Sequence, residues 1–118
     1  MTIVRQDVNG NEYMFINSSR GNRSGFVHET ELQRNGMVLG ENKIQYYNRT
    51  WERYTYESVM KGLVRELMNE CLEAYKTAWK NEHGIKRLTE EKRELMRKDL
   101  QENPPKNYAE LAELYKML

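Results

Sequence analysis

The chain has 118 residues, the usual length of one domain, and its mean hydropathy of −0.97 is strongly polar. Seven basic residues balance six acidic ones up to residue 56, and twelve balance twelve after it, so that the net charge is +1. Because no segment carries a basic excess, the composition disfavours a protein that binds double-stranded nucleic acid. The single cysteine, Cys71, excludes an intrachain disulfide and suits a reducing cytosol.

So polar a chain can form only a thin core, and we therefore expect it to oligomerise. Neither a signal peptide nor an apolar run of membrane-spanning length is evident, so we expect no contact with a membrane.

The first half of the chain predicts short antiparallel strands. Residues 2–8 and 12–17 flank Asn9-Gly10, a turn signal typical of hairpins. Residues 18–25 contain no apolar residue and predict a loop. Residues 26–32 alternate, which places Phe26, His28, Thr30 and Leu32 on one face. Asn35-Gly36 then turns into residues 37–39, and residues 43–48 form a further strand, which gives four or five strands in all.

The second half predicts helices. Apolar residues recur with the helical period from Val59 to Trp79, which predicts a long helix near residues 56–82 that ends at Gly84. Thr89 begins a second helix with acidic residues in its first turn, and Pro104-Pro105 breaks it. Residues 107–110 fit a capping box for a short last helix.

These elements predict an α+β fold in which a small antiparallel sheet packs on one long helix and a helical C-terminal arm follows. We expect residues 1–84 to form the ligand-binding domain and residues 85–118 to form the arm. The apolar stripe of the long helix is wide, which predicts contacts with both the sheet and a partner chain. The arm fits either an oligomerisation element or a solvated helical tail.

The sequence has no motif of a catalytic or metal site. His28 and His83 do not have the spacing of metal ligands, and one cysteine cannot build a zinc site. No P-loop, dinucleotide-binding or nucleophile-elbow motif occurs. We therefore expect a protein that is not an enzyme and that needs no cofactor or metal.

Two segments carry groups suited to a small anion. The first, residues 17–25, combines Arg20 and Arg23 with serines and glycines, whose side-chain and backbone donors suit a phosphate. The same composition is also typical of a solvated loop. Two or three cationic groups are enough for a small anionic ligand, so the even charge is compatible with such a site.

The second segment, residues 46–56, is dense in aromatic residues and arginine. Asn48 can hydrogen-bond a base edge or a ribose hydroxyl, and tyrosine and tryptophan rings offer stacking faces worth about 1–3 kcal/mol per base. Further along, Arg65 lies at the edge of the apolar stripe, where it can reach a phosphate or pair with Glu57 or Glu66. Side chains such as Trp51 and the tyrosines more often anchor a core or an interface than stack on a ligand.

The stretches NSSRGNRSGFVHETEL and YYNRTWERYTYESVM, with the helix that follows, resemble small phage-encoded proteins, the Thoeris anti-defence sponges of the first type. The resemblance covers residues 17–75. It implies a protein without catalytic activity that sequesters cyclic ADP-ribose isomers made by bacterial TIR-domain proteins, in the host cytoplasm, and so prevents activation of the effector. It also implies dimers that assemble into hexamers, and separate sites for cyclic oligonucleotides.

The resemblance further implies which residues hold the ligand. Asn48 and Arg65 match the asparagine and arginine that the family uses, and an aromatic ring lies against the adenine, for which Tyr46, Tyr47 and Trp51 are candidates. With the residues chosen above, the predicted ligand-binding set is Asn48, Arg65, Arg49, Tyr47, Trp51, Arg20 and Arg23.

Three alternatives remain open. The same aromatic residues and arginines suit a phage inhibitor that binds a host defence protein directly, as an anti-CRISPR protein does. They also suit a protein that binds RNA or single-stranded DNA, although the even charge disfavours a polymer. The third alternative is a structural phage protein without a ligand.

Overall fold

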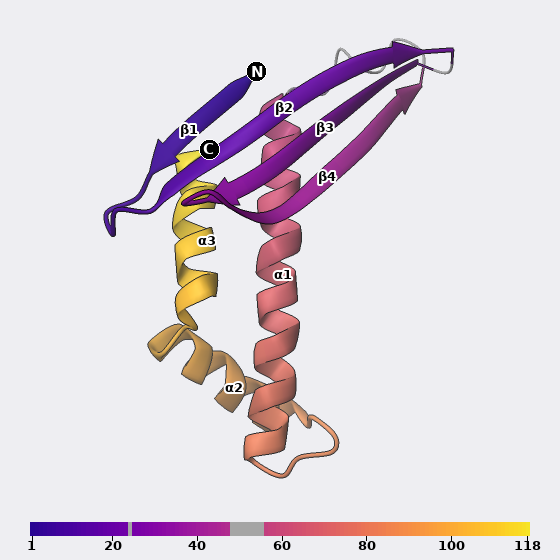
Figure 1. Cartoon of the computed structure of the whole chain (residues 1–118). Helices are drawn as coiled ribbons and strands as arrows, with labels where there is room; N and C mark the ends of the chain where they lie inside the picture. Colours follow the sequence, from indigo (N-terminus) through magenta and orange to yellow (C-terminus); the bar gives the residue numbers. More distant parts are fainter. Residues whose placement is uncertain (24, 48–55) are drawn as a thin grey trace.

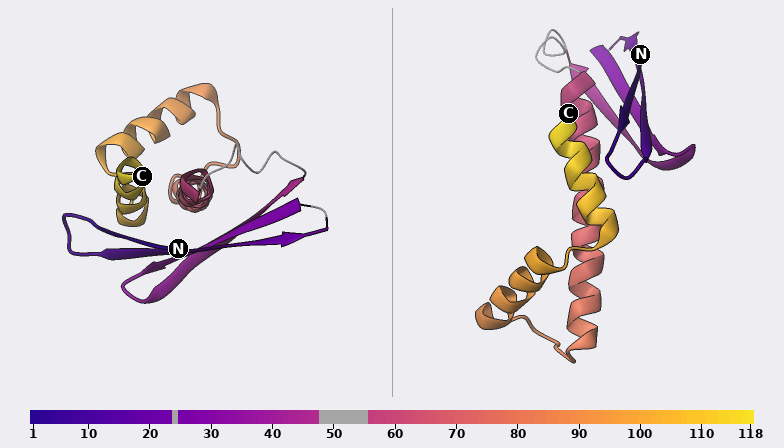
Figure 2. Two further views of the ribbon diagram at one scale, coloured as in Figure 1. Left: turned by 90° about the horizontal axis from the view of Figure 1, so that it is seen from above. Right: turned by 90° about the vertical axis from the view of Figure 1, so that its left-hand side faces the viewer.

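A computed structural model describes residues 1–23, 25–47 and 56–118, and it confirms the α+β class. Four antiparallel strands form one sheet in chain order, and three helices lie on one face of it (Figures 1 and 2). The elements are β1 (Thr2–Gln6), β2 (Glu12–Asn22), β3 (Gly25–Arg34), β4 (Met37–Tyr47), α1 (Tyr56–Glu82), α2 (Glu90–Glu102) and α3 (Lys106–Met117).

Both predicted Asn-Gly turns are confirmed. Gly10 has φ 84°, and Asn35 and Gly36 have φ 51° and 85°, values that glycine and asparagine adopt most readily. The Asn35 side chain also accepts a hydrogen bond from the backbone N–H of Glu12 at 2.8 Å. One turn thereby fixes the register of β1 with β2, and the other fixes the register of β3 with β4.

The prediction of a loop over residues 18–25 is wrong for residues 18–22 and for Gly25, which lie in strands, whereas Arg23 lies in a turn and Ser24 is outside the described residues. β2 continues to Asn22, and its residues pair with β3 as far as Asn22 opposite Gly25. Ser18 and Arg20 lie on the face of the sheet turned away from the helices, where they are exposed, so polar side chains do not prevent strand formation there. An antiparallel sheet with one open face accepts such residues readily.

The two strands predicted over residues 37–39 and 43–48 are also corrected, because β4 is continuous from Met37 to Tyr47. A shift of register between Leu32 and Gln33 leaves Leu39 as the extra residue of a bulge, so the strand bends without ending. The following Gly40 lies against α1, since a Cβ there would approach Leu67 Cδ2 to 3.2 Å.

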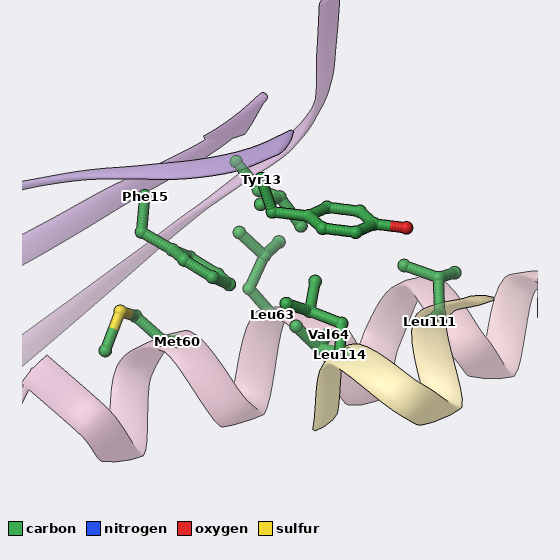
Figure 3. Close-up of a cluster of buried hydrophobic side chains, with 8 residues drawn as sticks. Tyr13, Phe15, Met60, Leu63, Val64, Leu111 and Leu114 are labelled. Atoms are coloured by element: carbon green, nitrogen blue, oxygen red, sulfur yellow. The ribbon is translucent and has the colours of Figure 1, made fainter. Parts of the chain in front are cut away.

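The core lies between the sheet and two helices. Tyr13, Phe15 and Leu32 of the sheet meet α1, whose predicted bounds near residues 56–82 are confirmed, and the cluster is completed by α3 (Figure 3). The α1 and α3 members of this cluster are Met60, Leu63, Val64, Leu111 and Leu114. Burial of each such side chain contributes about 1.5–3 kcal/mol.

This packing corrects one alternative for the C-terminal arm. α3 is not a solvated tail, because Leu111 and Leu114 are 5% and 0% exposed. Met68 and Cys71 of α1 pack, partly buried, against the core cluster to which α3 contributes, so part of the wide stripe that predicted a partner chain has its contacts within one chain. α2, in contrast, has no buried residue.

Three of the four predicted helix ends agree with the structure, including the end of α2 at Glu102, just before Pro104-Pro105. Gly84 has φ 63° just beyond α1, and the Thr89 hydroxyl accepts a hydrogen bond from the Lys92 N–H at 3.4 Å at the start of α2. The predicted capping box over residues 107–110 is wrong, because α3 begins at Lys106 and its N-cap is Pro105. Pro105 has the extended ψ of 141°, and its carbonyl accepts the first hydrogen bond of α3 from the Ala109 N–H. The Pro105 side chain makes no capping hydrogen bond. No helix in the described part of the chain combines the length and apolar character needed to span a membrane.

Candidate functional site

The sheet brings the two sequence segments of interest to one end. Gly25 lies opposite both Asn22 of β2 and Tyr47 of β4, and Phe26 lies opposite Tyr46. The turn after β2 and the end of β4 are therefore neighbours, although more than twenty residues separate them in the chain. The cause is the uninterrupted order of β2, β3 and β4, in which consecutive strands are adjacent.

Two of the predicted ligand-binding arginines lie at this end. Arg20 is on the outer face of β2, where its Nη2 lies 3.2 Å from Oε1 of Glu29, and Lys43 Nζ lies 3.7 Å from the same oxygen. Arg23, just beyond β2, is exposed. The Arg20 side chain is 64% exposed, and an ion pair so exposed contributes little, so its guanidinium can exchange Glu29 for a phosphate.

The inner face of the same strands carries buried polar groups that the sequence did not single out. Asn17 and Thr30 lie opposite each other and are 2% and 1% exposed. Among the described residues, Oδ1 of Asn17 and Oγ1 of Thr30 have no hydrogen-bond partner, while Nδ2 of Asn17 lies 3.6 Å from the sulfur of Met60. His28, two residues before Thr30 in β3, is also buried, and it lies on the face that the alternation of residues 26–32 predicted. The sequence signal that could have pointed to these buried groups is the presence of polar residues at inward-facing positions of a strand.

Arg65 lies on α1 and joins it to α3. Its Nη2 donates a hydrogen bond to the Tyr115 hydroxyl at 2.8 Å, and Cζ lies 5.7 Å from the centre of the Tyr115 ring. Glu57, a predicted partner of Arg65, pairs instead with Lys61 at 2.9 Å. Tyr115 was missed because it lies outside the segment of resemblance. A guanidinium has five N–H donors, so the bond to Tyr115 leaves others for a ligand.

The other predicted ligand-binding residues are only partly within the structure. Asn48, Arg49 and Trp51 lie outside the described residues, and Tyr47 is the last residue of β4. The structure thus brings Arg20, Arg23 and the position of Tyr47 to one end of the sheet. It places Arg65 on the side of α1 that faces α3.

Cys71 and His83, two side chains whose chemistry could support catalysis, each interact with their surroundings in the fold. Burial raises the pKa of the Cys71 thiol, which keeps it protonated and weakly nucleophilic. His83 stacks on Trp79 with ring centroids 4.1 Å apart, and its Nδ1 lies 2.9 Å from the Trp79 carbonyl oxygen. Within the described residues, no three histidine, cysteine or acidic side chains gather as metal ligands would.

Comparison of the chain with protein-family models, with curated proteins and with solved structures finds no match.

Proposed function

We propose that this protein is a phage anti-defence protein that binds and sequesters a cyclic nucleotide immune signal in the host cytoplasm. Its ligands are cyclic ADP-ribose isomers and, at separate sites, cyclic oligonucleotides, and it does not cleave them. The observation that carries the proposal is the register that sets Gly25 opposite Tyr47. It makes neighbours of the two stretches whose combination resembles the Thoeris anti-defence sponges of the first type.

The chemistry of the residues suits such a ligand. Cyclic ADP-ribose carries a pyrophosphate and an adenine, so its site needs cationic donors, a ring face and an amide. Arg20 and Arg23 supply cations at the end of the sheet where β4 ends, and from the sequence we assign the ring to Tyr47 and the amide to Asn48. Arg65 lies apart from these residues, on the side of α1 that faces α3, where it offers a further guanidinium that donates a hydrogen bond to Tyr115.

Sequestration requires tight binding rather than turnover. A protein that removes a scarce signal must bind it with a Kd below the concentration of that signal. A nanomolar Kd corresponds to a binding free energy of about −12 kcal/mol. A general base or a metal would be a liability at such a site, because it would hydrolyse the bound ligand. We therefore assign the candidate residues to binding alone.

The test is calorimetric titration with cyclic ADP-ribose isomers, followed by heating the complex and recovering the ligand. Intact ligand released after nanomolar binding supports the proposal. Consumed ligand would mean an enzyme, and an absence of binding heat would favour an inhibitor that binds a defence protein directly, which pull-down from a bacterial lysate would then identify.

Single substitutions localise the site. Asn48→Ala and Arg65→Ala are expected to abolish binding and to leave the thermal midpoint nearly unchanged, because Arg65 is exposed. Arg97→Ala is the matched control, since Arg97 is an exposed arginine on α2 in a surface ion pair with Glu94. A large loss of stability in Asn48→Ala or Arg65→Ala would instead assign that residue to the fold.

A further inference from the structure

The two asparagine–glycine pairs lie in hairpin turns, and the proposed function uses neither of them. Asn9-Gly10 lies between β1 and β2, and Asn35-Gly36 lies between β3 and β4. An asparagine followed by glycine is especially prone to spontaneous deamidation, because glycine has no Cβ to shield its backbone nitrogen from the preceding side chain. All four residues are exposed, so access of water does not distinguish the two pairs.

The side chain of Asn35 is held by two hydrogen bonds. Its Oδ1 accepts from the backbone N–H of Glu12 at 2.8 Å, and its Nδ2 donates to Oδ1 of Asn11 at 3.0 Å. The backbone N–H of Asn35 also donates to the carbonyl oxygen of Glu12 at 2.9 Å. Both polar atoms of the Asn35 amide are therefore directed toward the start of β2, and both hydrogen bonds must break before Cγ can turn to the nitrogen of Gly36.

The side chain of Asn9 has no such anchor. Its amide group makes no hydrogen bond to any of the described residues, while its backbone N–H donates to Oδ1 of Asp7 at 2.9 Å. The nitrogen of Gly10 donates to the carbonyl oxygen of Asp7 at 3.3 Å, which is longer than a typical N–H···O hydrogen bond. The amide of Asn9 is thus free to rotate, and the nitrogen that would attack it is only weakly bound.

We propose that Asn9 is a site of spontaneous deamidation and that the fold protects Asn35 from the same reaction. The backbone nitrogen of Gly10 bonds to Cγ of Asn9, and the side-chain amide leaves as ammonia with the proton of the Gly10 N–H, which closes a succinimide ring. Water then opens this ring at either carbonyl group and leaves aspartate or isoaspartate at position 9. Asparagine and water are thus converted to the acid and ammonia without an oxidant or a reductant. The reaction does not involve a nucleotide and is independent of the proposed function.

Isoaspartate changes the turn more than aspartate does. It routes the main chain through the former side chain and so adds one methylene group between residues 9 and 10. Oδ1 of Asp7 accepts from the backbone N–H groups of Asn9 and Asn11, both at 2.9 Å, and the extra backbone atom changes the separation of these two groups. Because the geometry of this turn sets the register of the hairpin, isoaspartate loosens β1, an edge strand of 5 residues.

The test is incubation of the full chain at pH 8, followed by digestion with trypsin and mass spectrometry. Trypsin separates the two pairs, because residues 6–20 form one peptide and residues 35–43 form another. Fragment spectra assign each replacement of an amide by a carboxyl group to one asparagine. In the folded protein we expect Asn9 to deamidate about tenfold faster than Asn35 or more, since each hydrogen bond of the Asn35 side chain adds to the barrier.

The matched control is the same incubation in concentrated urea, which removes the fold and leaves the sequence unchanged. It lasts until half of Asn9 in the urea sample has reacted. Both asparagines precede glycine, so their rates in urea should differ by less than about twofold. Asn11→Ala removes one hydrogen bond of Asn35 and should raise the rate at Asn35 several-fold. Thermal unfolding shows whether this variant is folded, and if it is not, the two wild-type peptides still decide the matter.

Equal rates at Asn9 and Asn35 in the folded protein would overturn the proposal, as would faster deamidation of Asn35. An Asn9 that reacts in urea and stays intact in the folded protein would also overturn it, since the turn would then protect both pairs. An unchanged rate at Asn35 in folded Asn11→Ala would overturn the protective role of the hydrogen bonds. Fast deamidation of Asn9 and slow deamidation of Asn35 in the folded protein, with similar rates in urea, support the proposal.

Discussion

Leu114→Ala tests whether α3 belongs to the core. Leu114 is fully buried at 0% exposure and lies in one cluster with Tyr13 and Phe15 of β2 (Figure 3). Truncating a buried leucine removes the transfer free energy of its methyl groups and leaves a cavity, which together cost about 2–5 kcal/mol. Small proteins have about 5–15 kcal/mol of stability in total, so this loss is a large fraction of it.

The expected shift in the thermal midpoint follows from the length of the chain. About 2.1 cal/mol/K of unfolding entropy per residue over 118 residues makes 1 kcal/mol worth about 4 °C, so Leu114→Ala should lower the midpoint by about 8–20 °C. Leu95→Ala on α2 is the matched control, since Leu95 is 57% exposed and its loss should cost about 0.5 kcal/mol or less. Both variants are melted at one protein concentration. Equal, small shifts in the two would refute the assignment of α3 to the core.

Two further predictions concern polar contacts, one between two helices and one between a helix and the sheet. Burial and a hydrogen bond to the Asp99 carboxylate raise the pKa of Tyr75 to about 12, so the folded state keeps a proton that the unfolded state loses near pH 10. The free energy of unfolding should therefore fall as pH rises from about 10 to about 12. Urea unfolding at pH 8 and pH 11 measures this fall, which should be smaller in Tyr75→Phe than in the wild type. Equal falls in the two proteins would contradict the coupling. Glu110→Ala should cost about 1–2 kcal/mol in urea unfolding, because Glu110 is 7% exposed and its loss leaves Arg34, 3.0 Å away, without its partner. Glu94→Ala removes a shorter but fully solvated ion pair and should cost about 0.5 kcal/mol or less, so equal costs would argue against burial as the cause.

The elements that the sequence predicted well are those with a strong period or a specific turn. The helical repeat of apolar residues located α1, and the Asn-Gly pairs located two hairpins, because both patterns depend on local geometry. The extension of β2 through Arg20 to Asn22 could not be predicted in this way. Its polar residues are acceptable in a strand only because one face of the sheet is open, which is a property of the tertiary structure.

The candidate site was predictable to a smaller extent. Residue types singled out Arg20, Arg23 and Arg65, but the pairing of Gly25 with Tyr47 depends on strand order, which composition does not contain. The contact of Arg65 with Tyr115 joins residues 50 apart in the chain. A wide apolar stripe on α1 predicted a partner for the helix, and the sequence did not distinguish α3 of the same chain from a second copy.

α3 therefore has two roles that a truncation would confuse. It buries Leu111 and Leu114 in the core, and its Tyr115 holds Arg65, to which the proposed function gives a ligand-binding role. A chain that ends at Gly84 would lose both, so its failure to bind a nucleotide would not distinguish unfolding from a lost contact. Tyr115→Phe separates the two roles, because it keeps the ring and removes only the hydroxyl at the exposed end of the contact. Weaker nucleotide binding at an unchanged thermal midpoint would show that α3 acts on the site through Arg65, whereas unchanged binding would limit α3 to its role in the core.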